Sequence, residues 1–277
     1  MPYIKKCRPI VSIITPVFNS AQYLQETINS IKAQSYKNIE YIVIDGGSTD
    51  GTVEIIKSNA DVISHWVSES DSGMYDALCK GLRMATGEYI GYLNAGDLYF
   101  DKSLETVVNV FTGNNKAKWI TSGRTICNTK SVITACDIPF RYKSRLIRKG
   151  VYGRFLPFIQ QESTFFHRSL LSIVNMNYLS KLKLAGDFFL WYEMSKENNL
   201  FIVETQLGIF KKHPGQLSES ITQYFDEIDS FCERRTYLDY LSLAFEAVSW
   251  SLHPRLRQWM DRRAFVYDHN DQEWKAM

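Results

Sequence analysis

Apolar, β-branched runs that stop at polar or acidic clusters recur along the N-terminal half of the chain, with helical polarity patterns between them. The apolar runs cover residues 11–15, 39–45, 62–67 and 89–93, and the helical patterns cover 21–34, about 50 onward, and 74–86. This alternation predicts a βαβ series, in which right-handed crossovers join parallel strands. The polar clusters that follow each strand should then lie together at the carboxyl edge of one sheet.

The pattern is less regular in the second half. The predicted elements are a helix at about 102–111 and strands near 119–126 and 131–135, and the irregular segment that follows is expected to be partly mobile. From about 221 to 265 the pattern is helical. One face of it carries an apolar stripe made of Leu241, Phe245, Val248 and Leu252. We therefore expect an α/β domain over residues 1–215 and a C-terminal helical extension over residues 216–277.

Composition excludes several classes of function. The 277 residues carry a formal net charge of +2 with 22% charged residues, which is too balanced for a nucleic-acid-binding protein. Five scattered cysteines without a C-x-x-C spacing argue against a disulfide framework and a zinc site, and they favour a reducing cytosol. No stretch approaches the ~18 apolar residues that a spanning helix needs, and no signal peptide is recognisable. We therefore expect a cytoplasmic protein with no nucleic-acid partner.

Short motifs follow the predicted elements in order. They are V-S-I-I-T-P-V-F-N at 11–19, Y-I-V-I-D-G-G-S-T-D-G-T at 41–52, S-E-S-D-S-G-M-Y-D-A-L-C-K-G at 68–81, Y-L-N-A-G-D at 92–97, Q-E-S-T-F-F-H-R at 161–168 and A-G-D-F-F-L-W at 185–191. Each alone is a weak signal, but together they extend from residue 8 to about 215 and resemble family 2 glycosyltransferases. The resemblance implies the GT-A fold, an α/β nucleotide-sugar-binding fold with a mainly parallel central sheet. Within this family, the chain is similar to enzymes that build bacterial surface polysaccharides, such as O-antigen or capsule.

The resemblance places a sugar-nucleotide donor at the ends of the first strands. Its implied donor contacts are Pro16, Val17, Phe18 and Asn19 against the base and ribose, Asp45 on a pyrimidine ring, and Asp71, Asn94 and Ala95 beside the rest of the donor. The residue types alone leave open that these are ordinary turns, because Pro, Asn, Asp and Gly favour turns everywhere. Asp50 immediately precedes a helical run, so we assign a structural capping role to it and ligand contact to Asp45.

A metal site is implied by the segment Asn94-Ala95-Gly96-Asp97. It stands where the family has a D-x-D signature, whose acidic residue binds Mn²⁺ or Mg²⁺ across the two donor phosphates. Only Asp97 keeps a carboxylate here, which is enough when phosphate oxygens and water complete the coordination. The departure leaves the choice between Mn²⁺ and Mg²⁺ open. His213 stands where some relatives supply a further metal or phosphate contact, although a lone histidine is more often a surface or packing residue.

Asp187 matches the family's catalytic base, at the start of a helix beneath the acceptor. In that role it would take a proton from an acceptor hydroxyl that attacks the anomeric carbon opposite the diphosphate, which inverts the configuration. Apolar neighbours such as Trp191 would raise its pKa by desolvation. The predicted acceptor contacts are Gln161, Glu162 and Trp191. The alternative for Asp187 is a carboxylate at a helix N-terminus that is merely stabilised by the helix dipole. The alternative for residues 161–162 is a strand edge that leads into the core.

Two further features each have two interpretations. Between Asp137 and Glu162 the only charged residues are basic, and they are Arg141, Lys143, Arg145, Arg148, Lys149 and Arg154. This basic run is either a solvated mobile loop or a clamp over the donor diphosphate or an acceptor pyrophosphate. The apolar stripe of the tail packs either against the catalytic domain or a second subunit, or it docks on a membrane surface. In the membrane interpretation the interfacial residues are Trp250, Trp259, Phe265, Arg255, Arg257, Arg262 and Arg263.

The resemblance thus implies metal-dependent, inverting transfer of a hexose from a nucleoside diphosphate sugar, with a leaning to UDP, onto a carbohydrate acceptor. In similar bacterial systems the acceptor is an oligosaccharide on a lipid at the cytoplasmic face of the membrane, which is an analogy between families. The rival is a non-catalytic sugar-nucleotide-binding or scaffolding protein of the same fold, which the thinned acidic motif and the long tail favour. A dinucleotide-binding oxidoreductase is excluded, because no G-x-G-x-x-G follows the first strand.

Overall fold

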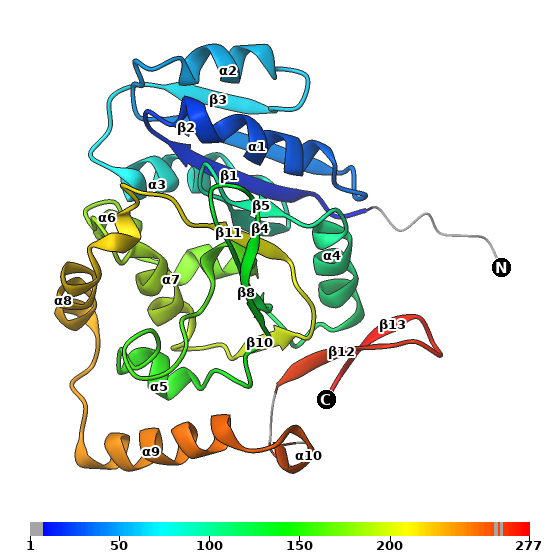
Figure 1. The fold of residues 1–277 in the computed structure, drawn as a ribbon, viewed down its shortest axis with the longest axis vertical. Coiled ribbons are helices and arrows are strands. Elements are labelled where there is room, and N and C mark those ends of the chain that lie inside the picture. Colours follow the sequence, from blue (N-terminus) through cyan, green and yellow to red (C-terminus); the bar gives the residue numbers. More distant parts are fainter. Residues whose placement is uncertain (1–7, 258–259, 261–262) are drawn as a thin grey trace.

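The computed structural model describes residues 8–257, 260 and 263–277. Within them, nine strands form one sheet (Figure 1). Their spatial order is β13 (Glu273–Ala276), β12 (Ala264–Asp268), β10 (Leu200–Val203), β6 (Trp119–Thr121), β9 (Phe165–His167), β4 (Tyr89–Tyr92), β1 (Val11–Val17), β2 (Ile39–Asp45) and β3 (His65–Ser68). Neighbouring strands are parallel except where β9 pairs with β4 and β6 and where β13 pairs with β12. The predicted α/β fold with a mainly parallel central sheet is confirmed.

Helices cover both faces of this sheet. Those of the first two hundred residues are α1 (Ala21–Lys32), α2 (Thr52–Ser58), α3 (Met74–Met84), α4 (Ser103–Gly113), α5 (Ser144–Arg148), α6 (Met176–Leu179) and α7 (Gly186–Met194). Ile14 and Ile44 pack with α3 and α7 in one apolar core, and Ile13 and Val43 pack with α1 and α4 in the other. Because side chains of successive strand residues point to opposite faces and both faces are covered, the strands read as continuous apolar runs.

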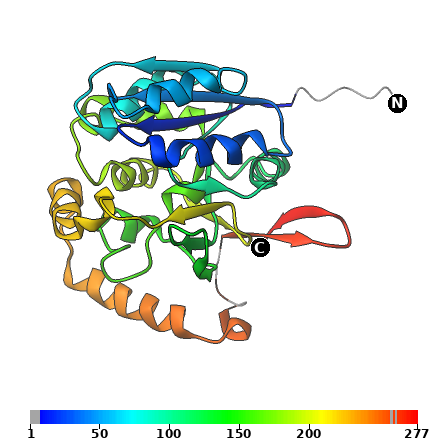
Figure 2. The same cartoon turned by 45° about the horizontal axis from the view of Figure 1, so that its top comes forward.

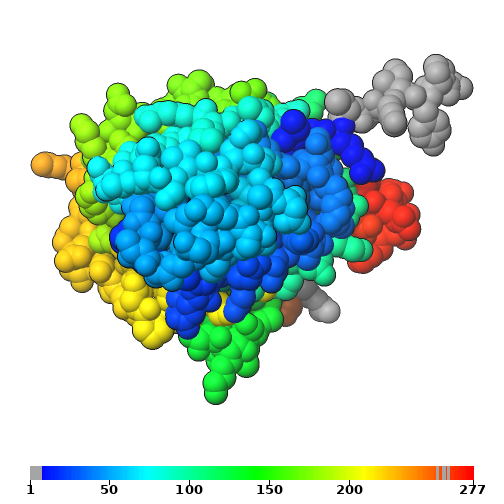
Figure 3. Space-filling view, turned by 90° about the horizontal axis from the view of Figure 1, so that it is seen from above, coloured from blue at the N-terminus to red at the C-terminus, as the bar shows by residue number. Residues whose placement is uncertain are grey.

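A second, smaller sheet lies beside the carboxyl edge of the first. It consists of β5 (Leu98–Tyr99), β11 (Gly208–Lys211), β7 (Arg124–Cys127) and β8 (Ile133–Asp137), in that order. The β7–β8 hairpin, green in Figure 3, projects from the surface. Short 3-10 helices connect the strands, namely η1 (Gln161–Ser163), η2 (Arg168–Ile173) and η3 (Leu217–Glu219). Strand β11 brings the segment after residue 207 next to Asp97.

The C-terminal extension begins with α8 (Ile221–Phe231), α9 (Tyr237–Ser251) and α10 (Pro254–Arg257). The helical prediction is wrong at its end, since residues 264–268 form β12, which pairs in parallel with β10. Phe265, assigned to a membrane interface, is buried in this strand. The extension therefore starts with helices and ends in the main sheet (Figure 2). A boundary at residue 215 stays a prediction.

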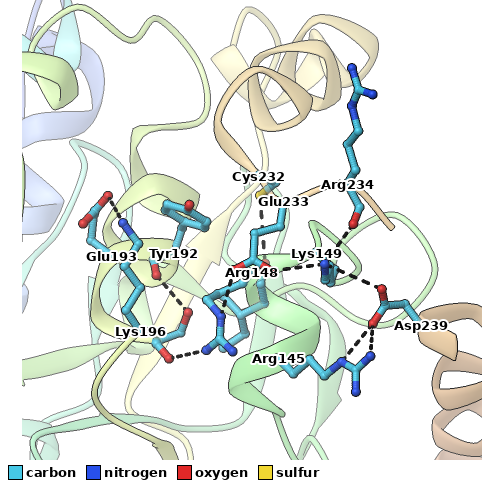
Figure 4. Close-up of polar contacts among 12 residues, drawn as sticks. Arg145, Arg148, Lys149, Tyr192, Glu193, Lys196, Cys232, Glu233, Arg234 and Asp239 are labelled. Carbon is cyan, nitrogen blue, oxygen red and sulfur yellow. Dashed lines mark hydrogen bonds and ion pairs between the residues drawn. The ribbon is translucent and has the colours of Figure 1, made fainter. Parts of the chain in front are cut away.

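The basic run of residues 141–154 is neither a solvated loop nor a phosphate clamp. Its segment contains α5 and apolar side chains that are buried in the core, among them Tyr142 and Leu146. Its basic side chains pair with acidic residues of α8, of α9 and of the segment between them (Figure 4). The pairs are Arg141 and Lys143 with Glu246, Arg145 and Lys149 with Asp239, Arg148 and Lys149 with Glu233, and Arg154 with Asp229. The run anchors α8 and α9.

Because of this anchoring, the polar face of helix α9 points toward the protein. Asp239 and Glu246 are buried against the basic run, and Ser249 is buried as well. The apolar stripe faces outward instead, and Phe245 and Val248 are 57% and 61% exposed. Packing of the stripe against the catalytic domain is therefore wrong. Burying carboxylates is favourable here only because each one meets a guanidinium or ammonium group.

The other residues assigned to a membrane interface are placed differently. Trp250 packs against Phe140 and Tyr142. Arg257 donates to the backbone carbonyls of Trp250 and Leu252, and Arg263 donates to Asn199. Trp259 and Arg262 lie outside the described residues, and so does the side chain of Arg255.

Candidate active site

The loops after β1 and β2 are joined at the carboxyl edge of the sheet. Asn19 lies in the left-handed region at φ 45°, which its short polar side chain tolerates. Its Oδ1 accepts from the Thr49 amide at 2.9 Å, and its own amide donates to Ser48 Oγ at 2.7 Å. Pro16 and Val17 are buried, so Phe18, which is 60% exposed, presents the main apolar surface at this corner. The four predicted donor residues thus divide into two buried and two exposed ones.

Asp45 ends β2 and is buried. Its Oδ2 accepts from the amides of Gly47 and Ser48 at 3.1 and 3.0 Å and from Ser68 Oγ at 2.6 Å. Its Oδ1 accepts from Ser48 Oγ. The carboxylate therefore holds the loops after β2 and β3 together, and Oδ1, which accepts a single hydrogen bond, is the oxygen with a lone pair left for a further donor. The donor role of Asp45 stays a prediction.

Two other aspartates shape the same edge. Asp71 Oδ2 lies so close to Gly46 that a Cβ there would come within 2.7 Å of it, which explains the glycine. Asp71 Oδ1 accepts from the Gly73 amide at 2.8 Å. The structural role of Asp50 is confirmed, because its carboxylate accepts from the first amide of α1, at Ala21, and from the first amide of α2, at Thr52. Asp71 is thus brought beside the loop of Asp45, as a shared donor site requires.

Asp97 is buried where β11 meets the loop after β4. Its Oδ1 accepts from the Lys211 amide at 3.0 Å. Asn94 Nδ2 donates to Gln161 Oε1 at 3.1 Å, so a predicted donor residue touches a predicted acceptor residue. Asn94 Oδ1 and Glu162 Oε1 are buried and have no hydrogen-bond partner among the described residues. Unpartnered buried oxygens at one edge fit a site that receives a cation or a donor group.

Glu162 and Asp97 form a buried acidic pair. Burial raises the pKa of Asp97 well above its usual value, and the charge of Glu162 raises this pKa further. Burial also raises the pKa of Glu162, with a smaller contribution from the charge of Asp187. Two buried carboxylates whose charges act on each other cannot both stay charged at little cost unless a proton or a cation lies with them.

His213 lies on the other side of the Asp97 loop. A Cβ on Gly96 would stand 3.6 Å from His213 Nε2. The ring stacks on Tyr23 at 4.0 Å between centroids, and Nδ1 lies 3.0 Å from the Pro214 carbonyl oxygen. A carbonyl accepts only from a protonated Nδ1, which leaves a lone pair on Nε2.

These donors fit a divalent cation that is only partly held by protein. Within the described part of the chain, no three His, Cys, Asp or Glu side chains gather at metal-binding spacing. Asp97, the unpartnered Asn94 Oδ1 and the Nε2 of His213 beside Gly96 offer two oxygens and one nitrogen, and Mn²⁺ or Mg²⁺ commonly takes its remaining ligands from phosphate and water.

Asp187 is the second residue of α7, at the same edge. Its Oδ1 accepts from the Phe188 amide at 2.7 Å, and the Tyr224 hydroxyl contacts both carboxylate oxygens at 3.3 and 3.4 Å. Burial raises the pKa of Asp187 to about 6. Gly186 is required because a Cβ there would come within 2.4 Å of the Tyr75 ring. A carboxylate with a pKa near neutrality has the basicity that a general base needs.

One acceptor prediction is wrong. Trp191 is buried in the core, where its ring stacks on Trp119 at 5.8 Å, so it cannot contact an acceptor. Gln161 reaches the site but donates to the Tyr92 carbonyl. Tyr75, Tyr224 and Glu227, which surround α7, were not predicted. No sequence signal marks the last two, because they lie in the tail beyond the recognised motifs.

The model of the family described as glycosyl transferase family 2 matches residues 12–172, which is more than half of the chain. The chain belongs to this family. An uncharacterized glycosyltransferase of Rickettsia typhi is 28% identical over 224 residues, covering 80% of this chain and 70% of the relative. In the described residues of our chain, no helix is both long and apolar enough to cross a membrane.

Solved structures show the same fold. A fragment of S. aureus TarS, residues 1–349 in complex with UDP-GlcNAc, matches with a TM-score of 0.60 and 17% identity, covering 91% of this chain and 72% of that fragment. The mannosyltransferase PcManGT of Pyrobaculum calidifontis, in complex with GDP-Man and Mn²⁺, matches with a TM-score of 0.59 and 17% identity, covering 91% of this chain and 72% of PcManGT. The family 2 glycosyltransferase therefore has the GT-A fold.

Proposed function

We propose that this glycosyltransferase moves a hexose from a uridine diphosphate sugar to a hydroxyl of a carbohydrate acceptor, with inversion of configuration and with Mn²⁺ or Mg²⁺. The observation that carries the proposal is the position of Asp187. Its half-buried carboxylate begins α7 at the edge where Asp71 and Asp97 lie, and its charge acts on Glu162 beside Asp97. This supports the proposal that a general base lies close to the donor site.

The reaction needs one proton transfer at Asp187. The carboxylate takes the proton of the acceptor hydroxyl while that oxygen bonds to the anomeric carbon from the face opposite the diphosphate. The bond between the anomeric carbon and the phosphate oxygen breaks, and its electron pair leaves with the nucleoside diphosphate. A divalent cation held by Asp97 and His213, with Asn94 beside them, would supply Lewis-acid stabilisation of that leaving group.

We further propose that the acceptor is a lipid-linked oligosaccharide of bacterial polysaccharide synthesis. The outward apolar stripe of α9 supports this, because such a helix can rest on a membrane surface with its polar side held by the protein. Vesicle flotation tests the contact, with Phe245→Ser as the variant and Val132→Ser, equally exposed on the β7–β8 hairpin, as its control. Loss of flotation in the first alone supports docking, whereas a wild type that never floats refutes it.

Turnover and binding of the donor separate this proposal from a scaffolding protein. Wild-type protein is incubated with UDP-GlcNAc or GDP-mannose, with Mn²⁺ and with carbohydrate acceptors, and release of the nucleoside diphosphate is measured. We expect turnover that Asp187→Asn abolishes while nucleotide binding survives. A wild type that binds nucleotide sugar but turns over none with any acceptor would favour the scaffold.

A further inference from the structure

The backbone that leads into α7 is held by a residue of the C-terminal extension. Glu227, on α8, accepts three backbone hydrogen bonds, from Lys183 at 2.8 Å on Oε1 and from Leu184 and Ala185 at 2.8 and 2.6 Å on Oε2. The Leu184 carbonyl accepts from the Tyr75 hydroxyl at 2.8 Å. The peptide just before Asp187 is therefore held from α8 and from α3.

The carboxylate of Asp187 meets the same helix one turn earlier. Tyr224 lies three residues before Glu227 on α8, a spacing that puts both on one helix face. Its hydroxyl is shared between the two oxygens of Asp187 in long contacts of 3.3 and 3.4 Å. The ring packs against Phe158 and Phe225, which fixes the direction of the hydroxyl.

Helix α8 is itself fixed from its other side. Asp229 pairs with Arg154 at 2.8 Å and with Arg235 at 3.5 Å. Just beyond the helix, Glu233 pairs with Arg148 at 3.2 Å and Lys149 at 3.1 Å. The basic run thus fixes α8 in the place from which Tyr224 and Glu227 reach α7.

We propose that α8 is part of the acceptor-side machinery, in which Glu227 and Tyr224 are positioning residues that set the backbone before Asp187 and the direction of its carboxylate. The inference rests on the proposed function, because positioning of Asp187 matters for catalysis only if Asp187 is the general base. It adds two residues of the C-terminal extension to the site. It also explains why α8 carries a glutamate whose two oxygens both accept from backbone amides of the segment that leads into α7.

Several titratable groups face Asp187 and enter any test by pH. They are Tyr75 on α3, Tyr92 on β4, Glu162 on η1, and Tyr224 and Glu227 on α8. Of these, the Tyr224 and Tyr75 hydroxyls each lower the pKa of Asp187 by a hydrogen bond, with the larger contribution from Tyr224, against the larger rise caused by burial. Removing that hydroxyl should therefore raise the pKa of Asp187, because the charged form loses a donor.

Tyr224→Phe keeps the ring and removes only this hydroxyl. With ¹³C-labelled aspartate, the NMR titration of Asp187 should move to higher pH, and the acid limb of kcat/KM should move in the same direction. Tyr237→Phe, on the exposed part of α9, is the control and should shift neither. An unchanged Asp187 titration in Tyr224→Phe would overturn the orienting role.

Glu227→Gln replaces a carboxylate that accepts three amide bonds by a group with one acceptor oxygen. Amide hydrogen exchange at Lys183, Leu184 and Ala185 should accelerate, and kcat should fall by about 10- to 100-fold with the donor KM unchanged, because the base is displaced. Asp226→Asn, exposed on the neighbouring position of α8, is the matched control and should alter none of these. Unchanged exchange and kcat in a folded Glu227→Gln variant would overturn the proposal.

The two hypotheses fail in different measurements. Hydrogen exchange and the NMR titration need no substrate, so they test the positioning contacts even if wild-type protein turns over neither UDP-GlcNAc nor GDP-mannose. Absent turnover in wild type refutes the proposed function. If amide hydrogen exchange and the Asp187 titration change but kcat is undiminished in both variants, α8 does not contribute to catalysis. Thermal unfolding of each variant establishes that it is folded.

Discussion

Replacing Asp187 by asparagine should make the protein less active and, at neutral pH, more stable. Burial raises the pKa of Asp187 from 3.8 to about 6. The folded state therefore prefers the protonated acid, and stability is lost as pH rises from about 4 to above 6. A rise of about two pKa units corresponds to at most about 3 kcal/mol. The asparagine has no charge to desolvate, so this loss is absent in the variant.

The assay is urea unfolding of wild type and Asp187→Asn at pH 4 and pH 8. We expect the stability of the variant relative to wild type to be higher at pH 8 than at pH 4 by at most about 3 kcal/mol, or several degrees in Tm for a chain of this size. Removing the charge of Asp187 also relieves Glu162, whose pKa it raises, which acts in the same direction. Activity should fall by about 10²- to 10⁴-fold, the usual contribution of a general base. A stability difference that does not change between pH 4 and pH 8 would refute a raised pKa for the half-buried Asp187 carboxylate.

Three further outcomes are expected. Asp97→Ala should lose Mn²⁺-dependent donor binding in calorimetry while it stays folded, and wild-type turnover that is indifferent to a chelator would contradict the metal assignment. The product of transfer should have the opposite anomeric configuration to the donor, as read from its anomeric proton coupling, since one base and no second carboxylate nucleophile is proposed; retention would refute this. Arg141→Gln should lower the free energy of unfolding by about 1.5–3 kcal/mol, because the buried Glu246 carboxylate loses its guanidinium partner and keeps Lys143, and a loss below about 1 kcal/mol in urea unfolding would show that the pair does not hold α9.

The first half of the fold could be read from local pattern. The strands at residues 11–17, 39–45 and 89–92 were predicted within two residues, because β-branched apolar runs between turn residues are decided by short-range chemistry. Their parallel order also placed the polar clusters at one edge. The prediction that Asp71, Asn94 and Asp97 share an edge with Asp187 needed the family motifs as well, since those residues are far apart in sequence.

The role of a side chain within a helix depends on how deeply it is buried in the folded protein, which the sequence does not give. Asp187 and Trp191 are four residues apart on α7, one turn and about 6 Å along the helix axis. In the first turn of α7 Asp187 is only half-buried, whereas Trp191 one turn later is fully in the core, so the aspartate reaches the site and the tryptophan stacks on Trp119.

Only the tertiary structure decided what the charges and the tail do. Arg141 meets Glu246 across 105 residues of chain, and Arg148 meets Glu233 across 85. A basic run is equally compatible with water, phosphate or carboxylate partners, and nothing local selects among them. Once those pairs form, α9 turns its apolar stripe outward and α8 brings Tyr224 and Glu227 to Asp187. The sequence by itself determined the strands, the turns and the identity of the acids at the sheet edge, because these follow from neighbours in the chain; which acid is desolvated, which is paired and which is held in place follows from contacts that exist only after folding.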